Sequence, residues 1–349
     1  MPVANISVSQ AFMTPSTEWK EVILPGEEQR LEEIGKAFAA IQEARARKHG
    51  MGRGLHIKPH AGLKASFTVN ADVPEYARVG LFAKPDTYKA YVRFSNGMGL
   101  RQDDRTPDVR GIAVKLVGVG GKKVIPPLAD AKTQDFLAIQ GAGLPISTGE
   151  DFAFIVLAGM KPLTLFPKLV SRFGIGGTFR LLKGLAKSRQ PPPGSQATRD
   201  YFSAVPIKFG PYAVRYKFKA LQTDEGPAGD TPDYLSTELQ KRISAGPVAF
   251  DFQVQFFIDE KQTPIEDAAV DWAAAPFVTL GRLTITQQNP GSPEGEALTK
   301  YVESLSFDPW HAQEELRPIG NFMRARNAAY RLSTSTRKAA AEPDGSEPY

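Results

Sequence analysis

Three long stretches in the second half of the chain alternate apolar and polar residues with a period of two, and this pattern constrains the fold most strongly. Successive side chains of a strand point to opposite faces, so sustained alternation predicts strands with one buried face. Shorter runs rich in β-branched and aromatic residues predict further strands between Gly54 and Ile139. The long stretches are YAVRYKFKAL (212–221), VAFDFQVQFFI (248–258) and FVTLGRLTITQ (277–287). Strands of this length favour a barrel or a strongly curved sheet.

Helices are predicted before, between and after the two groups of strands. An amphipathic pattern predicts a helix over 27–48, and helical spacing returns over 151–185. Because Pro is favoured at the first helical position, Asp308 and Pro309 predict the start of a last helix that continues to about Arg331.

The ends of the chain lack sustained periodicity. We predict an extended N-terminal arm over 1–25, one folded α+β domain over 26–337 and a disordered tail over 338–349. Such an arm is compatible with exchange between the subunits of a homo-oligomer.

Composition excludes several kinds of site. The chain has no cysteine, which rules out disulfides, thiolate metal sites, iron–sulfur clusters and a cysteine nucleophile. Only four histidines are present, so a three-histidine zinc site would need most of them to converge. The 43 basic residues are interspersed with 38 acidic ones, a balance that gives no indication of nucleic-acid binding.

No apolar run approaches the ~20 residues of a membrane-spanning helix, and the first residues lack the pattern of a signal peptide. We therefore expect a cytoplasmic protein. The basic and apolar segment 161–187 is compatible either with a helix packed on the sheet, which is the commoner arrangement, or with a helix lying on a membrane surface.

Three short motifs occur in an informative order. They are Arg53-Gly-Leu-His56, Tyr91-Val-Arg93-Phe94-Ser95 and Arg326-Asn-Ala-Ala-Tyr330. Each is weak alone, but their flanking sequences RGLHIKPHAGLKASFTV, KAYVRFSNGMG, DVRGIAVKLVGV, SFDPW and RNAAYRLSTSTR resemble the haem catalase superfamily over roughly residues 50–340. Because the chain is short and its first motif is degenerate, it is most similar to the small catalase-related haem peroxidases.

This resemblance implies an antiparallel eight-stranded β-barrel with surrounding helices and a wrapping N-terminal arm. It also implies a haem b cofactor whose iron is ligated by Tyr330, since Tyr is the proximal ligand in catalases. Arg326 lies one helical turn before Tyr330, where its charge can hydrogen-bond and stabilise the phenolate.

On the opposite haem face, the resemblance assigns His56 as the catalytic base and Ser95 as the residue that orients its ring. A shifted alignment would place His60 in that role, but His56 preserves the Arg-x-x-His motif and is preferred. A zinc site formed by these two histidines is disfavoured, because Gly and Pro around them oppose a helix.

The remaining implied cofactor contacts come from several segments. Arg53, Arg93 and Arg337 match residues that pair with the haem propionates, and Phe152 matches a phenylalanine that stacks on the haem. Gln140 is the best candidate to replace the distal asparagine of typical catalases, which this sequence lacks.

The function implied is a haem peroxidase that reduces hydrogen peroxide or organic hydroperoxides with a small organic electron donor and has weak catalase activity. A catalase-like allene oxide synthase or hydroperoxide isomerase fits the same motifs. A haem-binding sensor and a β-barrel binding module without haem are the non-enzymatic alternatives.

Overall fold

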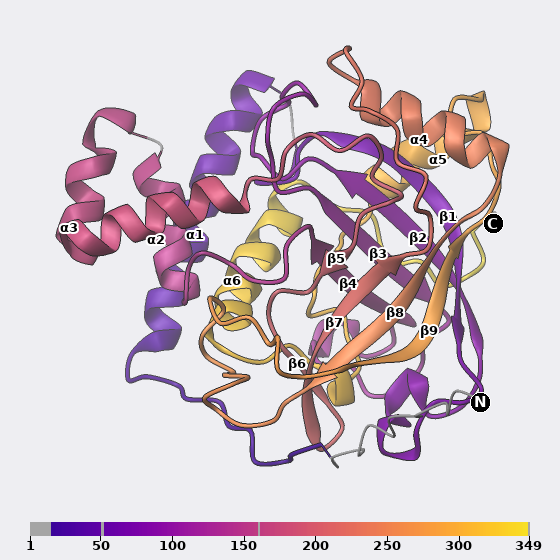
Figure 1. Cartoon of the computed structure of the whole chain (residues 1–349), viewed down its shortest axis with the longest axis horizontal. Helices are drawn as coiled ribbons and strands as arrows, with labels where there is room; N and C mark the ends of the chain where they lie inside the picture. Colours follow the sequence, from indigo (N-terminus) through magenta and orange to yellow (C-terminus); the bar gives the residue numbers. More distant parts are fainter. Residues whose placement is uncertain (1–14, 50–51, 160, 348–349) are drawn as a thin grey trace, which may run out of the picture.

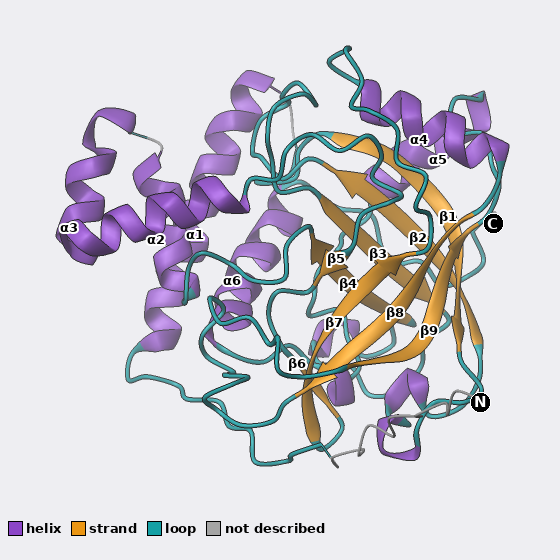
Figure 2. Cartoon of the chain, in the orientation of Figure 1, coloured by secondary structure: helices purple, strands orange, loops and turns teal. Residues whose placement is uncertain are grey.

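A closed antiparallel β-barrel forms the centre of the computed structural model, which describes residues 15–49, 52–159 and 161–347 (Figures 1 and 2). The hydrogen-bonded strand order is β5-β4-β3-β2-β1-β9-β8-β7-β6, and an additional pairing of β5 with β7 closes the ring. Eight strands thus form the barrel, as predicted, and β6 extends β7 as a hairpin. The strands are β1 (Pro59–Val69), β2 (Thr87–Ser95), β3 (Gly111–Val117), β4 (Thr133–Ile139), β5 (Tyr201–Phe202), β6 (Ile207–Phe209), β7 (Tyr212–Ala220), β8 (Val248–Phe256) and β9 (Phe277–Ile285).

Aromatic side chains fill the barrel. Phe252 of β8 lies with its ring centroid 5.5 Å from that of Phe67 on β1 and 4.9 Å from that of Phe136 on β4. These three rings come from separate parts of the ring of strands, so they bridge the interior. All three are buried. Burial of such side chains stabilises the fold by about 1.5–3 kcal/mol each.

Two helices pack together beside the barrel. α1 (Glu27–His49) lies along α6 (Asn321–Thr336), and the contact is close because Gly35 faces Ala328. A Cβ added at Gly35 would lie 2.9 Å from the Ala328 Cβ, so only glycine allows this approach. The carboxylate of Glu27 also pairs with Arg324 of α6. The helix predicted over 27–48 is confirmed.

The other helices lie on two sides of the molecule. α2 (Gly149–Gly159) and α3 (Pro162–Ser188) project from the barrel beside α1 (Figure 1). α4 (Tyr234–Ala245) and α5 (Pro293–Ser304) lie at another edge, where both contact β1. In the part of the chain that the structure describes, no helix is long and apolar enough to cross a membrane.

The predicted start of the last helix is wrong. The helix begins at Asn321, and residues 308–320 form turns with one short 3-10 helix at Glu314–Leu316. Tertiary contacts compete with the helical signal: the Asp308 backbone N–H donates to the Asp135 carboxylate (2.9 Å). Pro318 lacks an N–H and would break a helix that started at 309. Gly320, with φ of 85°, then precedes the actual first turn.

The described part of the N-terminal arm is extended and bound to the barrel and α6. The Trp19 indole N–H donates to the Pro211 carbonyl (2.8 Å), and Glu21 pairs with Arg324 (2.9 Å). Residues 1–14, the remainder of the predicted arm, lie outside the described residues.

The C-terminal tail is docked, and the prediction of disorder over 338–349 does not hold for its described residues. The Ala340 N–H donates to the Ser304 carbonyl (3.0 Å), and Glu342 enters a buried ion-pair network. Disorder was predicted because the tail is terminal and lacks sustained periodicity, whereas one buried carboxylate anchors the segment.

Candidate active site

His56 lies just before β1, against the ends of β2 and β3. Its Nδ1 is 3.0 Å from the Ser95 hydroxyl at the end of β2. Its backbone has φ of 53°, a strained conformation for a non-glycine residue. Two hydrogen bonds hold it: the His56 N–H donates to Gly97 O (3.0 Å), and Arg93 donates to His56 O (2.7 Å).

Gly111, the first residue of β3, provides the space for the His56 ring. A Cβ at Gly111 would lie 2.8 Å from His56 Cε1 and 3.1 Å from Nδ1. The sequence singles out DVRGIAVK without assigning this glycine a role. In the sequence, Gly111 is only a glycine at the start of a predicted strand. A glycine there can have several structural reasons, so its contact with the His56 ring could not be predicted.

The His56 imidazole is neutral. Burial, followed by the nearby charges of Arg93 and Arg326, lowers the pKa of His56 to about 3. A neutral imidazole has one unprotonated nitrogen, so a lone pair that can receive a proton is present at physiological pH.

Tyr330 and Arg326 form a second pair on α6. One turn separates them, and Arg326 Nη2 donates to the Tyr330 hydroxyl at 2.9 Å. The Arg326 guanidinium carbon also lies 5.1 Å from the Tyr330 ring centroid. Burial opposes the charge on Arg326, but Tyr330, Tyr216 and Asp308 together outweigh this effect and raise the pKa of Arg326. The pair therefore presents a phenol oxygen beside a permanent cation.

Two arginines bind one carboxylate near these pairs, and a third arginine lies beside them. Glu303, at the end of α5, accepts hydrogen bonds from Arg53 (2.9 Å) and Arg93. Arg337 and Arg53 both donate to the Leu305 carbonyl, at 2.6 and 3.0 Å. Burial, followed by the charge of Arg93, lowers the pKa of Arg53 to about 9. The group of Arg53, Arg93, Arg337 and Glu303 carries a net charge of +2.

These residues fit haem. Its two propionates carry a charge of −2, which would balance the net +2 of the arginine group. Arginine is suited to both carboxylates because its planar guanidinium binds them bidentately. Arg93 donates to the His56 carbonyl (2.7 Å), and the charges of Arg53 and Arg326 act on the His56 imidazole, so the three groups lie in one region of the molecule.

His60 lies in a different network. Its Nε2 is 3.1 Å from the Asp104 carboxylate, and its Nδ1 contacts the Gln196 amide. Asp104 also accepts a hydrogen bond from Lys58 (2.7 Å). Both ring nitrogens of His60 are therefore engaged by buried partners, whereas His56 contacts Ser95 through Nδ1. The geometry favours the alignment that uses His56.

Gln140 follows β4, close to the His56 side of the barrel. The preceding Ile139 pairs with Gly111, and the Gln140 N–H donates to Arg110 O (2.9 Å). Its side-chain Nε2 is buried and has no hydrogen-bond partner among the described residues. The Gln140 side chain also acts on the buried Tyr201 hydroxyl as a hydrogen-bonding neighbour, so its amide lies beside that phenol.

Among the described residues, no contact joins Phe152 to the His56–Ser95 pair or to the Arg326–Tyr330 pair. It lies on α2, with its ring centroid 5.5 Å from that of Phe322 at the start of α6.

Asp108 is buried and organises the loop after β2. Its carboxylate accepts hydrogen bonds from the backbone N–H groups of Gly97 (2.9 Å) and Met98 (3.3 Å). Because Gly97 in turn binds the His56 backbone, Asp108 supports the histidine indirectly.

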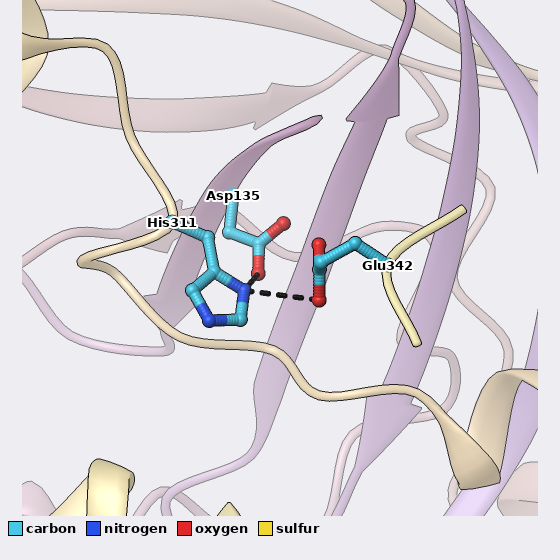
Figure 3. A group of neighbouring side chains, drawn as sticks. All are labelled: Asp135, His311 and Glu342. Atoms are coloured by element: carbon cyan, nitrogen blue, oxygen red, sulfur yellow. Dashed lines mark ion pairs between the residues drawn. The ribbon is translucent and has the colours of Figure 1, made fainter. Parts of the chain in front are cut away.

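A second buried cluster was not found from sequence. Asp135 of β4, His311 and Glu342 of the tail place one ligand atom each within 4.8 Å of one another (Figure 3). Lys115 of β3 lies among them, with Nζ 2.7 Å from Asp135 Oδ1 and 2.6 Å from Glu342 Oε2. Burial opposes protonation of His311, but hydrogen bonds to Asp135 and Glu342 raise the pKa of His311 to about 9. Two cations thus neutralise two carboxylates, and the group is an ion-pair network rather than a metal centre.

Comparison with solved structures identifies the fold. No protein-family model matches the chain. The structure is similar to a bacterial catalase (TM-score 0.59, 16% identity, 96% of this chain and 64% of that one). It is also similar to a fungal catalase (TM-score 0.63, 16% identity, 97% of this chain and 68% of that one). A third similar structure is catalase A of Saccharomyces cerevisiae (TM-score 0.62, 17% identity, 86% of this chain and 63% of that one). The fold is therefore that of catalases, and the chain spans about two thirds of their lengths.

The family follows from sequence. A catalase-related peroxidase of Mycolicibacterium paratuberculosis is 30% identical over 305 residues, which cover 82% of this chain and 88% of the relative. The chain belongs to the catalase-related peroxidase family.

Proposed function

We propose that the chain binds haem b and reduces hydrogen peroxide or organic hydroperoxides with a small organic electron donor. The observation that carries the proposal is the convergence of a neutral histidine, an arginine-bound tyrosine and a group of arginines with net charge +2. These three features match the proton acceptor, the axial ligand and the propionate partners of a haem peroxidase.

Haem, when bound, supplies the redox-active iron that the cleavage of a peroxide O–O bond requires. Tyr330 would hold the iron through its phenolate oxygen, and the fixed charge of Arg326 at 2.9 Å stabilises that anion. Arg53, Arg93 and Arg337 would pair with the propionates.

His56 moves the proton. Its neutral ring accepts the proton of the incoming hydroperoxide at the nitrogen that does not face Ser95, and the same nitrogen returns it to the departing oxygen. Ser95 fixes the plane of the ring, and Gly111 leaves room for it. The two hydrogen bonds to the His56 backbone hold the strained conformation that directs the ring.

Gln140 would orient the peroxide through its buried side-chain amide. Dismutation demands that a second hydrogen peroxide be oriented as a two-electron donor, whereas oxidation of an aromatic donor demands less of the distal side. Because an asparagine is replaced by a longer amide, we expect weak oxygen evolution and clear donor oxidation.

Three measurements on one preparation from haem-supplemented expression test the proposal. The first is the absorption spectrum: absence of a Soret band after haem-supplemented expression would reject every haem function. The second compares oxygen evolution with peroxide-dependent oxidation of a phenolic donor. Vigorous oxygen evolution with negligible donor oxidation would identify a compact catalase instead. Conversion of a lipid hydroperoxide to an isomer without donor consumption would identify an allene oxide synthase or isomerase.

A further inference from the structure

α3 is a bent helix that projects away from the barrel together with α2 (Figure 1). Gly174 interrupts it with φ of 67° and ψ of 171°, so that residues before and after the bend form two helical segments. One side of each segment is buried: Leu169 and Leu181 pack in a cluster with Ile146 and with side chains of α2. The helix pair is therefore a packed unit with a defined outer side. The commoner arrangement expected from sequence, packing on the sheet, is replaced by packing on α2.

The outer side of α3 exposes large apolar residues. Leu163 is 98% exposed, Ile175 66%, Phe179 60% and Phe166 49%. The rings of Phe166 and Phe179 come from opposite sides of the bend and lie 6.2 Å apart. The two segments thus present their apolar residues together, as one patch. Contiguous exposed patches of this kind mark interaction sites.

The same segment is strongly basic. Residues 161–189 contain seven Lys and Arg side chains, all exposed, and no Asp or Glu. Only Arg172 among them has an ion pair in the described part of the chain, with Asp151 of α2 (2.8 Å). Lys183 follows Phe179 by one turn, so a cation and an exposed aromatic ring share a helix face. The basic residues are Lys161, Lys168, Arg172, Arg180, Lys183, Lys187 and Arg189.

We propose that the outer side of α3 binds the surface of an anionic lipid bilayer. Exposed Phe and Leu side chains enter the boundary between headgroups and acyl chains, while neighbouring Lys and Arg side chains extend to the phosphates. A second copy of the chain is a poor occupant, because a two-fold contact would bring two uncompensated basic segments together. The proposal concerns binding alone and does not depend on haem.

Co-sedimentation of the full-length chain with lipid vesicles tests this directly. We expect binding to phosphatidylcholine vesicles that contain phosphatidylglycerol, weakening as salt is added, and much weaker binding to phosphatidylcholine alone. Charge reversal in Arg180→Glu/Lys183→Glu should weaken binding by roughly tenfold or more. The variant Phe166→Ser/Phe179→Ser should weaken it to a similar extent.

Matched controls separate the patch from general charge. Lys241→Glu/Lys300→Glu reverses two exposed lysines on α4 and α5, and Leu221→Ser removes an exposed apolar residue elsewhere. Both controls should bind like the unmodified chain, and circular dichroism should be unchanged in all four variants. The proposal is overturned if the unmodified chain stays in the supernatant with anionic vesicles. It is also overturned if the α3 variants bind vesicles as the controls do. That result would leave a soluble acidic protein as the alternative partner of α3.

Discussion

Replacing Glu342 with Gln tests whether the C-terminal tail is part of the folded structure. In the network of Lys115, Asp135, His311 and Glu342, two cations balance two carboxylates. Figure 3 shows the last three of these residues. The Glu342 side chain is only 9% exposed and also accepts hydrogen bonds from Thr133 (2.6 Å) and Ser306 (2.7 Å). Glutamine keeps the size of the side chain but leaves the buried network with an uncompensated positive charge.

The size of the effect follows from the burial of this charge. Removing one partner of a buried ion pair costs about 3–5 kcal/mol. Because glutamine can still accept hydrogen bonds and His311 can lose its proton, we expect the lower value, about 3 kcal/mol. For a chain of 349 residues, an unfolding entropy of about 2.1 cal/mol/K per residue converts this to a Tm decrease of about 4 °C.

The effect should depend on pH. The pKa of His311 is raised from its ordinary 6.5 to about 9, so its contribution to stability is complete below pH 6.5 and is lost as the pH rises through 9. Glu342→Gln removes part of that contribution. The difference in unfolding free energy between the unmodified chain and the variant should therefore be larger at pH 6 than at pH 9.5.

Thermal and urea unfolding at the two pH values measure both quantities. Glu347→Gln is the matched control, because among the described residues Glu347 accepts hydrogen bonds only from neighbouring backbone N–H groups of the tail, at Asp344 (2.9 Å) and Gly345 (3.0 Å). Equal stability of Glu342→Gln and Glu347→Gln at both pH values would refute the docked tail and support the disorder that the sequence predicts.

Three predictions concern His56 and its surroundings. His56→Ala should retain haem but slow peroxide cleavage by about 10²–10⁴-fold in stopped-flow measurements, whereas His60→Ala should mainly reduce the unfolding free energy, by about 1–3 kcal/mol; the reverse pattern would favour the shifted alignment. Because the pKa of His56 is about 3, its fraction as base stays high at lower pH, and the cleavage rate should show no acid limb near pH 6.5. Gly111→Ala should slow cleavage like His56→Ala, since its methyl group would meet the ring, while Gly120→Ala, with open space around it, should not.

Sequence patterns predicted the local structure well where the hydrophobic periodicity and the turn residues that end it agreed. The alternating runs over 212–221, 248–258 and 277–287 contain the strands β7, β8 and β9. Alternation could not give the number of strands, because that depends on which edges pair; it came from the resemblance to catalases. The two-residue strand β5, which closes the ring, has no periodicity that could reveal it.

In the candidate site, too, local relations could be predicted from the sequence and long-range contacts could not. The motif spacing places Arg326 and Tyr330 on one helix face, which is a local relation. Glu303 was missed because its contact with Arg93 joins residues 210 positions apart, and a lone glutamate on a surface-type helix carries no signal of that contact. The helix expected from Asp308 failed for a related reason, since Asp308 is fixed by Asp135 from a distant strand.

The assignment of Tyr330 as the iron ligand is the central claim, and the absorption spectrum of Tyr330→Phe tests it most directly. Phenylalanine keeps the ring that packs beside Arg326 but removes the oxygen at 2.9 Å from its Nη2. We expect the unmodified chain to bind haem with the spectrum of a tyrosinate-ligated ferric iron. Tyr330→Phe should lose stable haem or lose that signature, while keeping its circular dichroism. An unchanged spectrum in Tyr330→Phe would contradict the axial assignment and the function proposed from it.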